Sequence, residues 1–135
     1  MNITIKQGVD NVLFGMIVED VVSVIGKPDS VENMENAIDE STTVLRYDGQ
    51  GLTLFFDGDE LRLSCIDVCN EDVLLFGKKI FDLPERKIVE TMINNNYFEQ
   101  DADNEDWGER RISFPEGNID FFFENDSLVS VVIGK

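Results

Sequence analysis

Three acidic residues, Asp101, Asp103 and Glu105, have the spacing of the first ligands of a calcium-binding loop, where positions 1, 3 and 5 supply carboxylate oxygens. Such a loop also needs glycine at position 6 and glutamate at position 12. This sequence has Asp106 and Ile112 at those two places. Because the match fails where it is most diagnostic, we expect no metal site and no cofactor, with a loose cation site as the alternative.

The same segment, residues 99–109, surrounds the only tryptophan of the chain, Trp107, with carboxylates. Its acidic residues are Glu99, Asp101, Asp103, Glu105, Asp106 and Glu109. An aromatic ring among carboxylates suits a basic protein partner, because the ring can anchor the contact while the charges steer the encounter. The alternative is that Trp107 folds back onto the core while the acids stay in water.

A second acidic segment lies in the first half of the chain and contains Glu32, Glu35 and Asp39. Both acidic segments precede the first predicted strand of their half. We therefore take these three residues, together with the acids of 99–109 and Trp107, as the candidate partner-binding set.

The residue types of the chain do not support a catalytic function. The chain has no histidine, no glycine-rich phosphate loop and no serine with an evident activating base. With 28 acidic residues, some carboxylates lie close together by chance. The sequence therefore predicts a protein that is not an enzyme.

The charge balance excludes two classes of partner. Against 28 acidic residues stand 11 basic ones, which gives a net charge of −17. A surface of this charge repels phosphate backbones and anionic lipid, so we expect no binding to nucleic acid or membrane. The N-terminal residues lack the pattern of a secretory signal, and no apolar run approaches the ~20 residues of a membrane helix. These features predict a cytoplasmic protein.

The two cysteines, Cys65 and Cys69, are separated by three residues. A zinc site needs further Cys or His ligands, and a disulfide scaffold of this size needs more cysteines. We expect both thiols to be reduced and structural.

In the first half, Val18, Val21, Val22 and Ile25 recur at the spacing of one helix face, and the Gly26–Pro28 segment ends that helix. The polar residues 29–41 predict a loop. Apolar runs at 43–47, 52–56 and 61–66, separated by Asp-Gly turns, then predict a three-stranded antiparallel meander.

The second half repeats this order. A helix with an apolar stripe over 88–93 is predicted to begin at Asp82 as N-cap, with Glu85 completing a capping box and Pro84 in the first turn. An acidic loop over 99–109 follows. Strands are predicted at 111–114, 119–123 and 128–133. They match the first meander at one constant offset and without a gap, so that Ile119 corresponds to Leu52 and Ile133 to Ile66.

The sequence therefore predicts an α+β fold in a single domain over 1–135, a tandem repeat of two helix-then-three-stranded meander units packed around a shared Phe-rich core. Repeat one covers about 1–69 and repeat two about 70–135. Adjacent residues on a strand face opposite sides, so Phe122 points away from Phe121 and Phe123. Either another element covers Phe122, or it belongs to an exposed adhesive surface.

The segment Gly15–Pro28 resembles the repeat of the β-lactamase inhibitor protein and the small outer-membrane assembly lipoproteins, with Gly15, Met16, Val21 or Val22, Ile25, Gly26 and Pro28 at the motif positions. The second half lacks the Gly-x-Pro ending, and no lipid-attachment cysteine is near the start, so a lipoprotein role does not carry over. The resemblance implies a sheet that presents a protein-binding surface.

Small acidic chains of this kind also resemble immunity proteins, which neutralise toxin domains. We therefore expect a non-enzymatic immunity protein that covers the active site of a basic toxin, and we expect that toxin to be a nuclease domain. The alternative is an accessory or scaffold protein whose sheet mediates homodimerisation.

Overall fold

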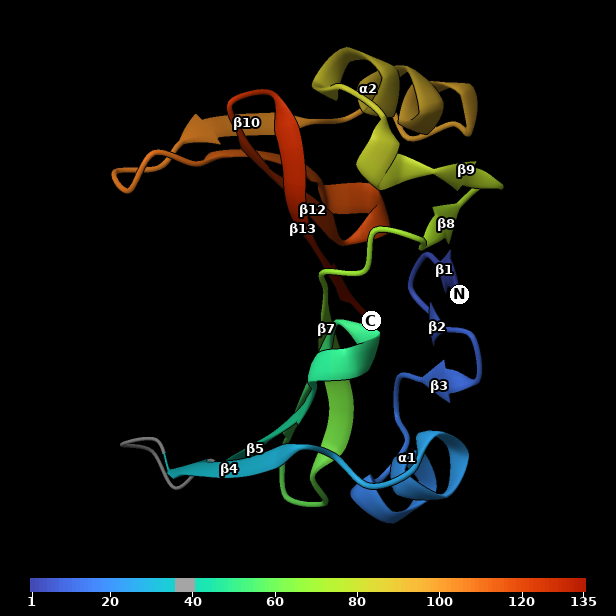
Figure 1. Cartoon of the computed structure of the whole chain (residues 1–135), viewed down its shortest axis with the longest axis vertical. Helices are drawn as coiled ribbons and strands as arrows, with labels where there is room; N and C mark the ends of the chain where they lie inside the picture. Colours follow the sequence, from blue (N-terminus) through green and yellow to red (C-terminus); the bar gives the residue numbers. More distant parts are fainter. Residues whose placement is uncertain (36–40) are drawn as a thin grey trace.

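The chain folds mainly into β-structure, with 47% of residues in strands and 21% in helices. The computed structural model describes residues 1–35 and 41–135 (Figure 1). The expected α+β class, with two units of a helix and three strands, is therefore wrong. Two strands lie where acidic loops were predicted, and an additional small sheet is built from very short strands that leave almost no periodic signal.

The strands form two sheets. The small sheet has the order β3-β2-β1-β8-β9, and the large sheet has the order β10-β11-β12-β13-β7-β6-β5-β4. The bounds of the small-sheet strands are β1 Asn2–Thr4, β2 Gly8–Val9, β3 Val12–Leu13, β8 Leu74–Leu75 and β9 Lys78–Lys79. The bounds of the large-sheet strands are β4 Ser30–Glu35, β5 Ser41–Tyr47, β6 Leu52–Asp57, β7 Arg62–Val68, β10 Asp101–Asn104, β11 Arg110–Phe114, β12 Ile119–Glu124 and β13 Ser127–Gly134.

The large sheet is antiparallel throughout, and each half of the chain contributes four consecutive strands to it. Strands β7 and β13, the last of each group, pair with each other at the centre. The two expected meanders are thus parts of one continuous sheet of eight strands.

At the predicted offset between the two halves, β6 matches β12, so that Phe55 corresponds to Phe122. Strands β7 and β13 do not match at that offset. Phe55 pairs with Cys65, whose counterpart at that offset is Val132, whereas Phe122 pairs with Ser130. The turn between β12 and β13 is therefore shorter than its counterpart between β6 and β7, and the expected gapless match is wrong over β13. Both hairpins carry a bulge at the same place, directly after Phe55 and Phe122.

The outermost strands, β4 and β10, occupy the segments that were predicted to be loops. The residues of β10 are all exposed, as are the side chains of 30–34 in β4. Since neither strand buries a face, no apolar alternation marks it in the sequence. Charged residues on such strands also discourage pairing with other chains at the sheet edge.

Helix α1 (Val18–Ile25) has the predicted bounds and ends at Gly26, whose φ of 89° is in the region that favours glycine. Helix α2 (Glu85–Asn94) begins differently from the prediction. Its N-cap is Pro84, while Asp82 lies in a short 3-10 turn. The backbone N–H of Glu85 donates instead to Asp126 Oδ1 at 3.3 Å, so an acceptor from the β12–β13 turn replaces the predicted capping box.

One hydrophobic core connects both halves. It lies between the large sheet on one side and the helices with the small sheet on the other (Figure 1). Phe114 and Phe121 pack edge to face within it, with ring centroids 5.9 Å apart. Figure 1 shows that the opposite side of the large sheet has no covering layer, so the curved sheet leaves an open, concave face between β4 and β10.

Candidate partner-binding surface

The open face of the large sheet is defined by the strand residues that alternate with the core residues. On β6 and β12 the core receives Leu54, Phe56, Phe121 and Phe123, so the intervening residues point to the other side. We use the name central patch for five of the half-buried residues in the middle of this face, Phe55, Asp67, Asp120, Phe122 and Val132.

The register of the strands brings these residues together. Asp120 is directly opposite Val132, and Val132 is directly opposite Asp67, so the three form a row across β12, β13 and β7. Phe122 is opposite Ser130 and Phe55 is opposite Cys65, which places the two rings in the rows beside Asp120 and Asp67. The central patch therefore combines two carboxylates with apolar contact area.

Neither carboxylate of the central patch forms an ion pair with a residue that the structure describes. Burial raises the pKa of Asp67, and the nearby charge of Glu109 raises it further. A contact from the Cys69 thiol, 3.7 Å from Asp67 Oδ1, and the charge of Arg46 act in the opposite direction. Asp67 thus keeps a half-buried charge that the fold only partly compensates.

The two thiols are free, as predicted. Burial, together with the negative charge of Asp67, raises the pKa of both Cys65 and Cys69 to about 11. The charge of Asp120 also acts on Cys65, so Asp67 and Asp120 approach this thiol from two strands. At neutral pH both cysteines are therefore neutral thiols and poor nucleophiles.

The predicted acids of β10 converge on one basic residue. Arg111 contacts Asp103, lies 3.5 Å from Asp101 Oδ2 through Nη2, and lies 3.6 Å from Glu105 Oε1 through Nε. Its side chain is only 20% exposed. The three acids at the calcium-loop spacing thus pair with a guanidinium, and no cluster of metal-ligating side chains is found in the described ranges.

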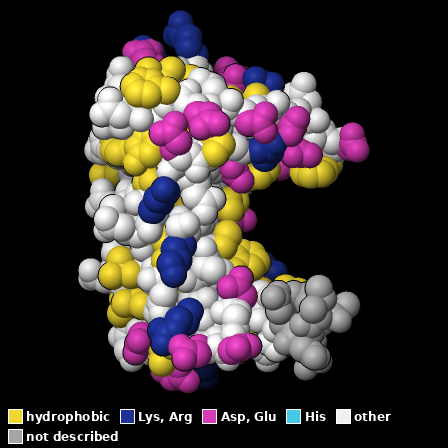
Figure 2. Space-filling model, turned by 180° about the vertical axis from the view of Figure 1, so that it is seen from behind, with side chains coloured by type: hydrophobic (Ala, Val, Ile, Leu, Met, Phe, Trp, Pro, Cys, Tyr) yellow, Lys and Arg dark blue, Asp and Glu magenta, His cyan; other side chains and the backbone are white. Residues whose placement is uncertain are grey.

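We use the name acidic arm for residues 99–111, which include β10 and the turn to β11, and most of its remaining predicted residues are exposed. Trp107 is 67% exposed, and its Nε1–H donates to Glu109 Oε2 at 2.9 Å. The alternative in which Trp107 folds onto the core is therefore wrong. Glu99 and Asp106 are exposed. Figure 2 shows the acidic side chains gathered on the upper arm beside the hollow, whose wall carries hydrophobic side chains.

The predicted residues of the first half lie at the opposite edge of the sheet. Glu32 on β4 pairs with Arg46 on β5, with Oε2 and Nη2 3.4 Å apart. Glu35 is the last residue of β4, and Asp39 lies outside the described residues. The candidate residues that the structure describes thus separate into two groups at the two edges of the large sheet, and they do not include the central patch between these edges.

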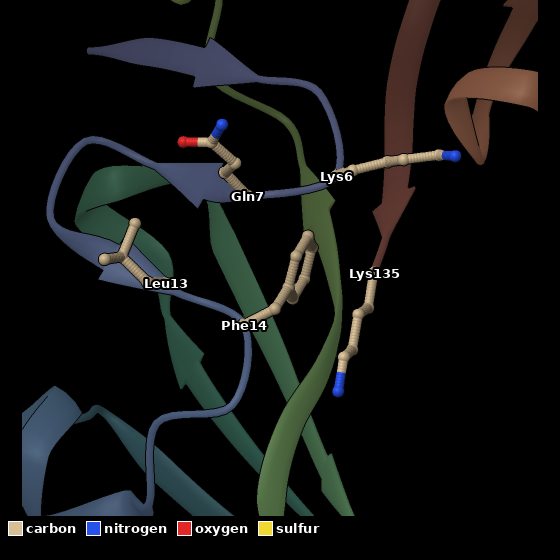
Figure 3. Close-up of a pocket in the computed structure, with 5 residues that line it drawn as sticks. All are labelled: Lys6, Gln7, Leu13, Phe14 and Lys135. Carbon is tan, nitrogen blue, oxygen red and sulfur yellow. The ribbon is translucent and has the colours of Figure 1, made fainter.

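A separate hollow on the molecule, about 240 Å³ in volume, is lined by Lys6, Gln7, Leu13, Phe14 and Lys135. The two lysine side chains extend in different directions around the Phe14 ring (Figure 3). They therefore do not converge on one point, and these five residues include no pair of nucleophile and base.

No known protein family, curated protein or solved structure matches this chain. Neither helix that the structure describes is long and apolar enough to cross a membrane.

Proposed function

We propose that the protein is a non-enzymatic acidic binding protein, and most specifically an immunity protein that neutralises a basic toxin domain by covering its active site. The observation that carries this proposal is the uncovered concave face of the large sheet, with acidic side chains gathered on the arm at its β10 edge (Figure 2) and Glu32 on β4 at the other edge. Apolar side chains on this uncovered face, such as Phe55 and Phe122, are the feature that indicates an interaction surface.

Charge supports a cationic protein as the partner. The net charge of −17 accelerates encounter with a basic surface and disfavours nucleic acid and anionic membranes. A nuclease domain carries such a basic surface because it must bind phosphates. Carboxylates at the open face would occupy the phosphate positions and exclude the substrate.

The exposed Trp107 supports the same partner class. Tryptophan is enriched among the residues that dominate binding energy at protein interfaces. Its hydrogen bond to Glu109 orients the ring at the tip of the acidic arm. The charge of Glu109 also acts on Asp67, so the arm and the central patch influence each other electrostatically.

Homodimerisation through the open face is less well supported. Two copies joined face to face would bring Asp67 and Asp120 near their own counterparts, and like charges at a desolvated interface oppose association.

The candidate toxin is the product of the reading frame next to the gene for this protein. The experiment expresses that product in a bacterial host with and without this protein. We expect that product to be toxic alone and harmless with its partner. The double variant Glu99→Lys with Asp106→Lys should lower the association rate by about tenfold at low salt and weaken its salt dependence. The double variant Glu19→Lys with Glu116→Lys changes the net charge equally on α1 and the β11–β12 connection, and should associate faster than the first variant.

Two outcomes would contradict the proposal. If the adjacent product is neither toxic nor bound, the immunity function is wrong. If the two charge-reversed variants associate at the same rate as each other, the acidic arm is not part of the interface.

A further inference from the structure

The centre of the open face has an arrangement that the edge acids do not share. Asp120, Val132 and Asp67 follow one another directly across three neighbouring strands. Since adjacent strands are about 4.8 Å apart, the two carboxylate-bearing positions are separated by about 10 Å, with the Val132 side chain between them. Phe122 and Phe55 lie in the adjoining rows.

The edge acids pair directly with arginines, whereas this pair has only more distant cations: the charge of Arg46 acts on Asp67, and Asp120 acts on Arg111. Arg111 forms ion pairs with Asp101, Asp103 and Glu105, and Arg46 forms one with Glu32. Asp67 and Asp120 have no ion-pair partner in the part of the chain that the structure describes, although both are half-buried. A half-buried carboxylate without a directly paired cation opposes folding, so the pair has no evident structural role.

We propose that the central patch is the docking site for an arginine side chain of the cationic partner. The guanidinium would lie over Val132, where the side chains of Asp67 and Asp120 approach it from either side. Phe55 and Phe122 would flank it. This inference rests on the proposed function, because it names the group that the same open face receives.

Arginine fits this site better than other cations do. Its planar guanidinium has five N–H donors that can serve two carboxylates at once, and it packs well on aromatic rings. A lysine ammonium is a compact point charge that lacks the planar fork of donors with which a guanidinium serves two carboxylates. A metal ion suits the site less well, because calcium takes about six to eight oxygen ligands and the described residues include no group of three metal-ligating side chains.

The first test measures binding of the side chain alone. N-acetylarginine amide is titrated into ¹⁵N-labelled protein, and N-acetylcitrulline amide serves as the neutral analogue of the same shape. We expect the amide resonances of 65–68, 120 and 132 to shift with the arginine compound and not with the citrulline compound. The double variant Asp67→Asn with Asp120→Asn should weaken this binding about tenfold. The control variant Asp20→Asn with Asp59→Asn removes the same charge at exposed positions outside the central patch and should retain it.

Equal shifts for both compounds, or arginine-induced shifts confined to the acidic arm, would overturn the docking site. The failure of this inference differs from that of the proposed function. Arginine binding at the central patch without neutralisation of the adjacent gene product would overturn the immunity function alone. Neutralisation that is unchanged in Asp67→Asn with Asp120→Asn would overturn the docking site alone.

Discussion

Asp67 and Val132 are directly opposite each other in the central strand pair and also occupy equivalent positions in the two halves of the chain. The hairpin registers equate Cys65 on β7 with Ser130 on β13, and the same offset equates Asp67 with Val132. The local two-fold relation between the halves therefore passes through this pair. At the one place where both halves meet, one supplies a carboxylate and the other an isopropyl group, so the central patch is asymmetric.

The charge of Asp67 should reduce stability at neutral pH. Burial raises the pKa of Asp67, so the folded protein holds this proton more tightly than the unfolded chain does. Its contribution to stability is complete below the ordinary carboxyl pKa and is lost as the pH rises through the raised value. We therefore expect Asp67→Asn to increase the free energy of unfolding at neutral pH, with the gain vanishing at about pH 3.

Urea unfolding at the two pH values measures this difference. Asp59→Asn, in the exposed turn between β6 and β7, is the matched control and should change stability by no more than about 0.5 kcal/mol. A less stable Asp67→Asn protein at neutral pH would show that the carboxylate has a structural partner after all. Combined with weaker arginine binding, a more stable variant would identify Asp67 as a residue kept for function at the expense of stability.

Neighbouring phenylalanines on β12 should differ strongly in their contribution to stability. Phe121 is fully buried against Phe114, whereas Phe122 lies half-buried on the open face. Truncating a buried Phe costs about 3–5 kcal/mol, so Phe121→Ala should leave the protein barely stable. Phe122→Ala should cost only about 1 kcal/mol. Denaturant unfolding of the two variants gives the comparison, and equal losses would mean that the assignment of the two faces is wrong.

The sequence predicts well the elements that bury an apolar face. The valines of α1 and the alternating residues of β6 and β12 have one side against the core, and that contact produces the periodic signal. Strands β4 and β10 extend beyond the covering layer, so their residues carry no such signal. The sequence also does not reveal that the turn before β13 is shorter than its counterpart before β7. The apolar residues of β13 alternate in the same way in the predicted register and in the observed one.

The candidate site was predicted only at its edges. The acids of 99–109 can be recognised in the sequence because they are clustered. In the structure, Arg111 on β11 neutralises part of their negative charge across the β10–β11 pair. Asp67 and Asp120 are acids flanked by apolar residues in β7 and β12, and their proximity depends on the pairing of β13 with both strands. A signal was present in the sequence, since an acid flanked by apolar residues in a strand marks the face that the core does not use.

Removing Arg111 should loosen the acidic arm. In Arg111→Gln, three carboxylates remain close together without their cation, so β10 should separate more readily from β11. We expect a loss of about 1 kcal/mol, with faster hydrogen exchange at the amides of 101–104 and partial recovery in high salt. Arg46→Gln is the matched control, because its single pair with Glu32 is more exposed. Exchange rates that are equal in Arg111→Gln and the unaltered protein would show that backbone pairing alone holds β10.

Thiol reactivity should report the electrostatics of the central patch. The pKa of both cysteines is about 11, so the alkylation rate with iodoacetamide should rise about tenfold per pH unit up to that value. Cys69 is exposed and should react ahead of the half-buried Cys65. Because the negative charge of Asp67 raises the pKa of both thiols, Asp67→Asn should lower both values and accelerate alkylation at a fixed pH. Mass spectrometry of Cys65→Ser and Cys69→Ser separates the two rates, and Asp59→Asn controls for net charge. A Cys69 rate that levels off near about pH 8.5, the value of a free cysteine, would show that Asp67 does not act on this thiol.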